Sequence, residues 1–169
     1  MVRMMRKKRK HKTPYGTDCR GSPQKYHLGY TLRTDVAILH LDAGEELDYG
    51  GHLSVLYALI EGLALACDID RKEVDGCLRS DGRGSYDYVF FDNTPGGAGY
   101  VKTMTPETLH NIVNRSINLL EGCDCGGTEG DGSCYGCLRN YRNQKYHEKL
   151  NRGVAMKYLK HIKELMDDD

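Results

Sequence analysis

The sequence lacks two features that would direct it to or through a membrane. No apolar run approaches the length of a membrane-spanning helix, because the longest candidate is interrupted by Glu61. There is no secretory signal peptide pattern either, since the basic start is followed by further basic residues and then by Pro14 and Gly16. We therefore expect a cytoplasmic protein, in which cysteine thiols stay reduced.

The motifs of nucleotide-binding and catalytic sites are also missing. The glycine-rich stretch at residues 95–99 matches neither the GxGxxG fingerprint nor the GxxxxGK[ST] phosphate loop. Glu61 and four histidines have no partner at a spacing typical of acid–base catalysis; these histidines are His40, His52, His110 and His147. The sequence therefore offers no catalytic residues, and we expect the isolated chain not to be an enzyme.

Net charge is absent as well, with 24 Lys and Arg residues against 24 Asp and Glu residues among 169. This balance hides an asymmetry, because residues 1–12 hold 7 basic residues and no acidic one. The rest of the chain therefore carries 17 basic and 24 acidic residues, a net charge of −7. An acidic body argues against a globally basic nucleic-acid-binding surface. The basic start itself suits either contact with phosphates or a solvated tail. We predict a basic, irregular segment over residues 1–26 and one domain over residues 27–169.

Four cysteines within fifteen residues are the strongest signal that is present. Cys123 and Cys125 are separated by eight residues, half of them glycine, from Cys134 and Cys137. Two close pairs can direct four thiolates at one tetrahedral Zn²⁺, and a closed site of this kind stabilises a fold without activating water. Two disulfides fit poorly, because the total of seven cysteines is odd and adjacent pairs constrain little chain. Three of these cysteines with His147 are the alternative ligand set.

Hydrophobic periodicity predicts a mixture of strands and helices. Strands are expected at residues 31–41, 73–78 and 86–92, and helices at residues 52–67, 106–121 and 151–166. Thr105 and Pro106 suit the N-cap and the first helical position, and Gly122 ends that helix just before the cysteines. The predicted class is α+β: a single domain with a short sheet, about three main helices and a four-cysteine zinc knuckle.

A glycine-rich loop follows the predicted strand at residues 86–92. Its Pro95, Gly96, Gly97 and Gly99 suit either a tight strand-to-helix turn or a loop that presents backbone N–H groups to an anion. Asp92, just before the loop, is expected to cap the turn rather than to act as a catalyst. A small stand-alone hydrolase or nuclease that uses Asp92 and this loop is the alternative function.

Aromatic and basic residues alternate after the cysteine cluster, over residues 139–152. Such a pattern suits stacking on single-stranded nucleic acid and neutralisation of its phosphates. A solvated segment that braces the zinc knuckle is the alternative interpretation. The candidate contacts are Arg139, Tyr141, Arg142, Lys145, Tyr146, Lys149 and Arg152.

Four stretches resemble a known family. They lie at residues 34–41 (TDVAILHL), 56–76, 89–101 (VFFDNTPGGAGYV) and 123–159, so the similarity covers roughly residues 27–165. Together they resemble the MrfA zinc-binding (MZB) domain at the C-terminal end of certain DEAD/DEAH-type superfamily 2 DNA helicases, of mitomycin-repair and phage-defence types. The combination of PGGAG with a downstream C-x-C and C-x-x-C-L is specific.

The resemblance implies zinc ligation by Cys123, Cys125, Cys134 and Cys137, and a signature turn of unknown role formed by Asp92 and residues 95–99. It implies a non-catalytic zinc module that belongs to, or works with, a superfamily 2 helicase in DNA repair or phage defence, and that either supports strand separation or contacts DNA. A Walker A loop and an acidic helicase motif are missing from this sequence. The ATP-driven motor is therefore expected elsewhere, in the same protein or on a partner chain.

Overall fold

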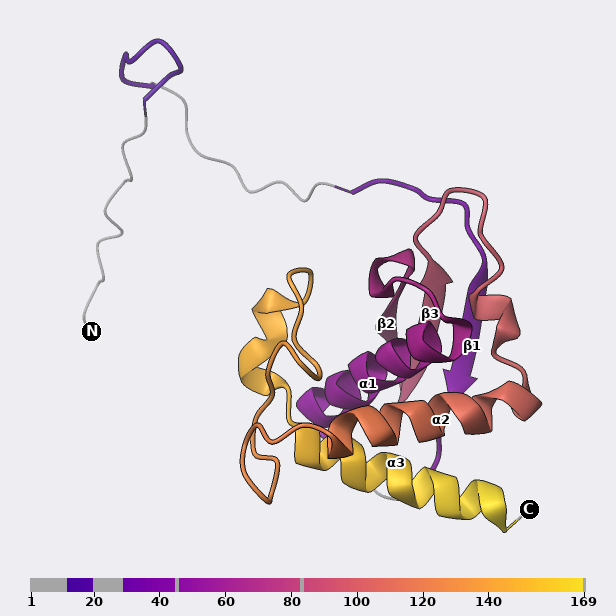
Figure 1. Ribbon diagram of the computed structural model, residues 1–169. Helices are drawn as coiled ribbons and strands as arrows, with labels where there is room; N and C mark the ends of the chain where they lie inside the picture. The colour runs from indigo at the N-terminus through magenta and orange to yellow at the C-terminus, as the bar shows by residue number, and fades with distance from the viewer. Residues whose placement is uncertain (1–11, 20–28, 45, 83, 169) are drawn as a thin grey trace. The chain divides into compact units, whose positions relative to one another are not determined.

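The chain divides into two units, Met1–Thr31 and Leu32–Asp169, in a computed structural model that describes residues 12–19, 29–44, 46–82 and 84–168 (Figure 1). In the first unit, residues 12–19 form a turn in which Lys12 pairs with Asp18 and the Thr13 N–H donates to the Thr17 carbonyl at 2.8 Å. The predicted domain boundary at residues 26 and 27 lies outside the described residues, as do the basic residues 3–10.

The second unit holds the regular elements (Figure 1). They follow in the order β1 (Val36–His40), α1 (Tyr49–Cys67), the 3-10 turn η1 (Arg71–Glu73), β2 (Val74–Ser80), β3 (Tyr86–Asp92), η2 (Val101–Thr103), α2 (Pro106–Glu121), η3 (Gln144–Lys149) and α3 (Arg152–Asp167). This confirms the predicted α+β class with its short sheet and three main helices.

The sheet is antiparallel with strand order β1-β3-β2, so β3 lies in the centre. Val36 pairs with Phe91 on one side of β3, and Val74 pairs with Asp92 on the other. The strand predicted at residues 31–41 begins only at Val36. The reason is that the chain before it bonds to the loop after β3, where the Gly96 N–H donates to the Arg33 carbonyl at 2.9 Å.

Helix α1 forms the centre of the core and contacts α2, α3 and β2. It begins three residues before the predicted His52, because Asp48 caps it and accepts the Gly51 N–H at 2.7 Å. By length and composition this helix suits a membrane span, with 19 residues and a mean hydropathy of 1.4, so the expectation that no apolar run approaches that length is wrong. Since 78% of its most apolar stretch is buried inside the fold, α1 acts here as a core helix.

Helices α2 and α3 are amphipathic and pack with α1 through their apolar stripes. Helix α2 crosses α1 at Gly62, where an added Cβ would lie 2.5 Å from the Ile112 carbonyl oxygen and would also strike the Ser116 hydroxyl. Thr105 caps α2 and Pro106 opens it, as predicted. The helix ends at Glu121, and the chain passes through Gly122 directly into the cysteine segment.

Candidate metal centre and neighbouring surfaces

The segment between α2 and η3 brings all four cysteines of the predicted knuckle together. The Sγ atoms of Cys123 and Cys134 are 3.5 Å apart, those of Cys125 and Cys137 are 3.6 Å apart, and those of Cys134 and Cys137 are 3.9 Å apart. All four Sγ atoms lie within 4.8 Å of one another. His147 is not part of this group: its Nε2 lies 2.9 Å from Asn143 Oδ1 and 3.1 Å from the Asn140 carbonyl.

These distances fit a four-sulfur zinc site. Sulfur ligands at about 2.3 Å from a tetrahedral ion are separated by about 3.8 Å from one another. A disulfide would need about 2.05 Å between sulfurs, and none of the seven cysteines, which all lie in the described part of the chain, forms one. The geometry therefore suits Zn²⁺ and not two disulfides.

The electrostatics of the cluster also suit a dication. Burial is the largest cause that raises the pKa of the Cys137 thiol well above its usual value, and burial likewise raises that of Cys125. Burial acts in the same direction on Cys134, but the Gly136 N–H and the neighbouring thiols outweigh it and lower the pKa of that thiol. Four thiolates this close repel one another, so a bound Zn²⁺ would supply the positive charge that lets all four ionise.

Backbone N–H groups and glycine turns shape the loop around the sulfurs. The Gly136 N–H donates to the Sγ of Cys134, and the Cys134 N–H donates to the Sγ of Cys137, both at 3.3 Å. Gly126 has a φ of 75°, and an added Cβ there would lie 2.5 Å from the Asp131 carbonyl oxygen. Only glycine fits this position without strain.

The first turn of α3 is hydrogen-bonded to the loop that carries the four cysteines. Arg152 is only 5% exposed, and its guanidinium donates to three carbonyl oxygens: that of Cys125 at 3.0 Å, that of Leu120 at 2.8 Å and that of Gly127 at 2.8 Å. Its backbone N–H donates to the Gly132 carbonyl at 2.7 Å. The proposal of Arg152 as a nucleic-acid contact is corrected by these bonds, because every guanidinium nitrogen already donates to a carbonyl of the cysteine loop or of the end of α2.

Arg139 is also partly committed to the loop. Its Nε donates to the Ser133 hydroxyl at 2.9 Å and its Nη2 donates to the His147 carbonyl at 3.3 Å. Asn143, 1% exposed, donates to the Leu138 carbonyl at 2.8 Å. The segment after the cysteines therefore braces the knuckle, as the alternative interpretation predicted.

Other members of the predicted contact set face solvent. Tyr141 is 83% exposed, and Arg142, Lys145 and Lys149 are exposed too. Tyr146 is half-buried against Tyr49, with ring centroids 6.3 Å apart, and Lys145 Nζ lies 4.6 Å from the centre of its ring. A hydrogen bond from Lys145 is the main cause that lowers the pKa of Tyr146.

The glycine-rich loop after β3 wraps around the carboxylate of Asp92. This side chain is 0% exposed and accepts four backbone N–H groups. Its Oδ2 accepts from Ala98 at 2.8 Å, Gly99 at 2.7 Å and Tyr100 at 3.2 Å, while its Oδ1 accepts from Val101 at 3.0 Å. The N–H groups that an anion would need are thus directed at Asp92, so Asp92 caps the turn as predicted.

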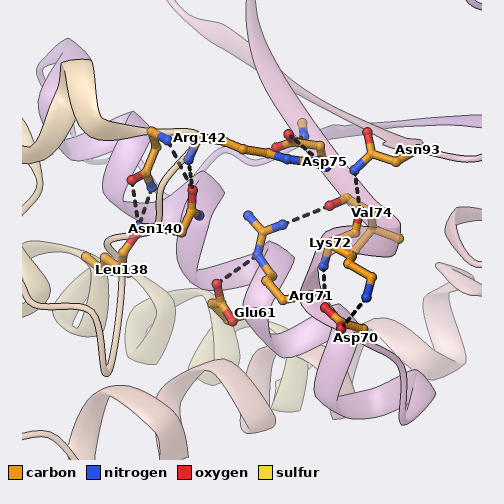
Figure 2. A network of polar contacts seen from close by, with 12 residues as sticks. Glu61, Asp70, Arg71, Lys72, Val74, Asp75, Asn93, Leu138, Asn140 and Arg142 are labelled. Carbon is orange, nitrogen blue, oxygen red and sulfur yellow. Dashed lines mark hydrogen bonds and ion pairs between the residues drawn. The ribbon is translucent and has the colours of Figure 1, made fainter.

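The structure adds two basic residues that the sequence did not single out. Arg71 and Lys72 of η1, together with Asp70, line a hollow of about 230 Å³ whose other side is formed by Asn140, Tyr141 and Arg142. Figure 2 shows η1 and this later segment facing each other. A basic pair shortly after a helix is common in sequences, so nothing in the local sequence indicates that these two residues lie near Tyr141.

Comparisons with known proteins were made on this fold and site. The family described as MZB, the MrfA Zn-binding domain, matches residues 55–138. The Druantia protein DruE of Escherichia coli (strain UMEA 4076-1) is 28% identical over 162 aligned positions, and the match covers 85% of this chain and 8% of DruE. A crystal structure of the DUF1998 helicase MrfA bound to DNA superposes with a TM-score of 0.53 and 17% identity, over 91% of this chain and 19% of that one.

The chain thus spans less than a fifth of the length of either relative. At 17% identity the likeness to MrfA supports the fold alone, whereas the family match covers the core helix α1 from residue 55 onward, the glycine-rich loop and all four cysteines. The prediction of zinc as the cofactor is confirmed by that match together with the four clustered thiols. This chain therefore carries a MrfA Zn-binding domain, as its sequence motifs indicated.

Proposed function

We propose that this chain is a non-catalytic zinc-binding module that serves a superfamily 2 DNA helicase of DNA repair or phage defence. The helicase motor would lie in the same polypeptide or on a partner chain in the cytoplasm. The family match and the two helicase- and defence-related proteins support this proposal. The zinc ligands would be Cys123, Cys125, Cys134 and Cys137.

The four-thiol cluster is the observation that carries the non-catalytic part. Four sulfur ligands complete a tetrahedron, so no position is left for a reacting water. The cluster also lies between two helices, because Arg152 links the end of α2 to the start of α3 beside it. Binding energy at such a site is folding energy, so the zinc would hold together an irregular loop that has little core of its own.

The alternative hydrolase or nuclease function loses its candidate catalyst. Both carboxylate oxygens of Asp92 are occupied by backbone N–H groups inside the fold. Lys102, the first lysine after the glycine-rich loop, pairs with Asp35 at 2.8 Å, and two residues separate it from Gly99, whereas the lysine of a phosphate loop directly follows its glycine. Neither residue is placed to handle a nucleotide phosphate.

Contact with DNA is the second part of the proposal. It would use the solvent-facing residues of the segment after the cysteines, which are Tyr141, Arg142, Lys145 and Lys149. The cysteine loop would set the position of this segment, since the side chains of Arg139 and Asn143 donate hydrogen bonds to that loop. Removal of the metal is therefore expected to weaken DNA binding along with stability.

Two measurements on the purified chain test the proposal. Elemental analysis is expected to give about one zinc per chain, and Cys134→Ser is expected to abolish it. ATP hydrolysis, with and without DNA, is expected to stay at the level of that variant. A folded, metal-free protein, or turnover that depends on Asp92, would overturn the assignment as a non-catalytic zinc module.

The helicase partner is tested through the gene. Motor motifs in the same reading frame or in an adjacent one would identify the candidate motor, and that protein should show higher DNA-dependent ATP hydrolysis or unwinding with this chain than without it. The motor's ATP hydrolysis and unwinding should therefore be compared in three samples: with this chain, with the Cys134→Ser variant and with neither. Equal rates in all three would contradict the proposed role as a helicase module.

A further inference from the structure

A hollow beside the zinc loop combines the features of a site for one nucleotide of single-stranded DNA. It lies between η1 and the segment at residues 140–142, which are far apart in the sequence (Figure 2). Its volume of about 230 Å³ suits one base or one phosphate and not a duplex. Its lining offers an aromatic ring, three cations and one carboxylate.

Tyr141 provides the stacking surface. Its side chain is 83% exposed, and no ring lies against it among the aromatic contacts of the described residues. The backbone around it is held firmly, because Asn140 Oδ1 accepts the N–H groups of Arg142 and Asn143 at 2.9 and 3.1 Å. A tyrosine on a fixed turn loses little entropy when a base stacks on it, which favours binding.

Lys72 and Arg142 provide mobile positive charge at the rim. Lys72 is 66% exposed and pairs with the exposed Asp70 at 2.9 Å, while Arg142 is 53% exposed and lies 3.6 Å from Asp75. Ion pairs of this kind are weak, so a phosphate can compete with the carboxylates for both cations. The same carboxylates repel the denser charge of a double helix, which favours a single strand.

Arg71 also lines the hollow, and two of its three guanidinium nitrogens are bonded to the protein. Its Nε donates to Glu61 at 2.7 Å and its Nη1 donates to the Val74 carbonyl at 2.8 Å (Figure 2). Its Nη2 is buried and has no hydrogen-bond partner among the described residues. A guanidinium with an unused donor under the lining keeps this part of an acidic protein attractive to an anion.

We propose that the hollow lined by Arg71, Lys72, Tyr141 and Arg142 binds one nucleotide of single-stranded DNA, with its base on Tyr141 and its phosphate between Lys72 and Arg142. This inference rests on the proposed contact between the module and DNA, and it names the strand type and the residues that bind it. Residues Arg71 and Lys72 extend that contact to a second segment, so that η1 and the segment after the cysteines bind the strand together.

The test uses the full, zinc-loaded chain and a fluorescein-labelled dT12 strand in a low-salt anisotropy titration. Tyr141→Ala is expected to raise the Kd about 5- to 150-fold, which is the range for loss of one stacked base. Tyr135→Ala is the matched control, because Tyr135 is 67% exposed on the same zinc loop but does not line the hollow, and its Kd should not change. An abasic strand of the same length should bind the native chain as weakly as dT12 binds Tyr141→Ala.

A second pair of variants tests the phosphate. Lys72→Ala should reduce the slope of log Kd against log salt concentration by about 0.7, the value for one phosphate of a single strand. Lys102→Ala, which removes an equally exposed lysine elsewhere, should leave the slope unchanged. Binding that survives both Tyr141→Ala and Lys72→Ala would overturn this site and leave the proposed module intact. A chain that binds no strand would overturn this site and the proposed DNA contact, while the zinc content would still test the module.

Discussion

Arg152 gives the most direct test of how the fold and the metal loop depend on each other. Its guanidinium donates three hydrogen bonds at 2.8 to 3.0 Å, two to carbonyls of the loop that carries the cysteines and one to a carbonyl in the last turn of α2, and it is almost completely buried. A lysine at this position keeps the charge, but its ammonium is compact and cannot reach three separate carbonyls in the plane of a guanidinium. Arg152→Lys therefore loses about two of the three side-chain hydrogen bonds.

The expected cost follows from those bonds. A hydrogen bond to a charged group contributes about 1.5–3 kcal/mol, so the loss of two corresponds to about 3–6 kcal/mol. Domains are stable by only about 5–15 kcal/mol, so this is a large fraction of the total. At about 3 °C per kcal/mol for a unit of this size, the melting temperature should fall by about 9–18 °C.

Thermal denaturation at a fixed zinc concentration, followed by circular dichroism, measures this change. Release of zinc to a coloured chelator should also be faster in Arg152→Lys, because the carbonyls of Leu120, Cys125 and Gly127 then no longer hold the loop against α3. Arg142→Lys is the control: that side chain is exposed and its ion pair is 3.6 Å long, so its melting temperature should change little. Equal melting temperatures for the two variants would refute the role of Arg152 as a clamp.

Three other variants probe the metal cluster, the glycine-rich loop and the helix crossing. Cys134→Ser should lower the melting temperature far more than Cys67→Ser, since zinc binding contributes on the order of 10 kcal/mol, whereas the half-buried Cys67 contributes packing and one contact of its Sγ with the Thr103 hydroxyl at 3.3 Å. Similar melting temperatures would contradict the zinc assignment. Asp92→Asn should lower the free energy of unfolding, measured by urea titration, by about 3 kcal/mol, because the amide NH₂ would face backbone N–H groups that donate to the carboxylate in the native chain. An unchanged urea midpoint would argue against the turn-capping role. Gly62→Ala should cost about 1–3 kcal/mol through the clash between α1 and α2, while Gly29→Ala, with open space around its Cβ, should be neutral; equal stability of these two would show that the crossing can relax.

Most of the secondary structure followed from local patterns in the sequence. The apolar periodicity of α1, α2 and α3 placed each helix to within about three residues, because one buried face at a spacing of 3.6 residues is enough to define a helix. The start of α1 was the weakest point, since Gly50 and Gly51 conceal a helix whose N-cap is Asp48. Strand β1 was placed too long, because residues 33–35 bond to the loop after β3.

The cysteine spacing by itself determined that a four-sulfur metal site was available, because ligands this close in sequence meet whatever the rest of the chain does. It could not show which neighbours hold the loop. Arg139, Tyr141 and Arg152 follow the same alternating pattern in the sequence, yet one braces the loop, one faces solvent and one is buried under the cysteines. The hollow beside Tyr141 depends on η1, which lies about 70 residues earlier in the chain. Local residue types set helices, turns and metal ligands because those depend on near neighbours. The use of each charged side chain was decided only by the tertiary structure, because it depends on which distant carbonyl or carboxylate the fold places beside it.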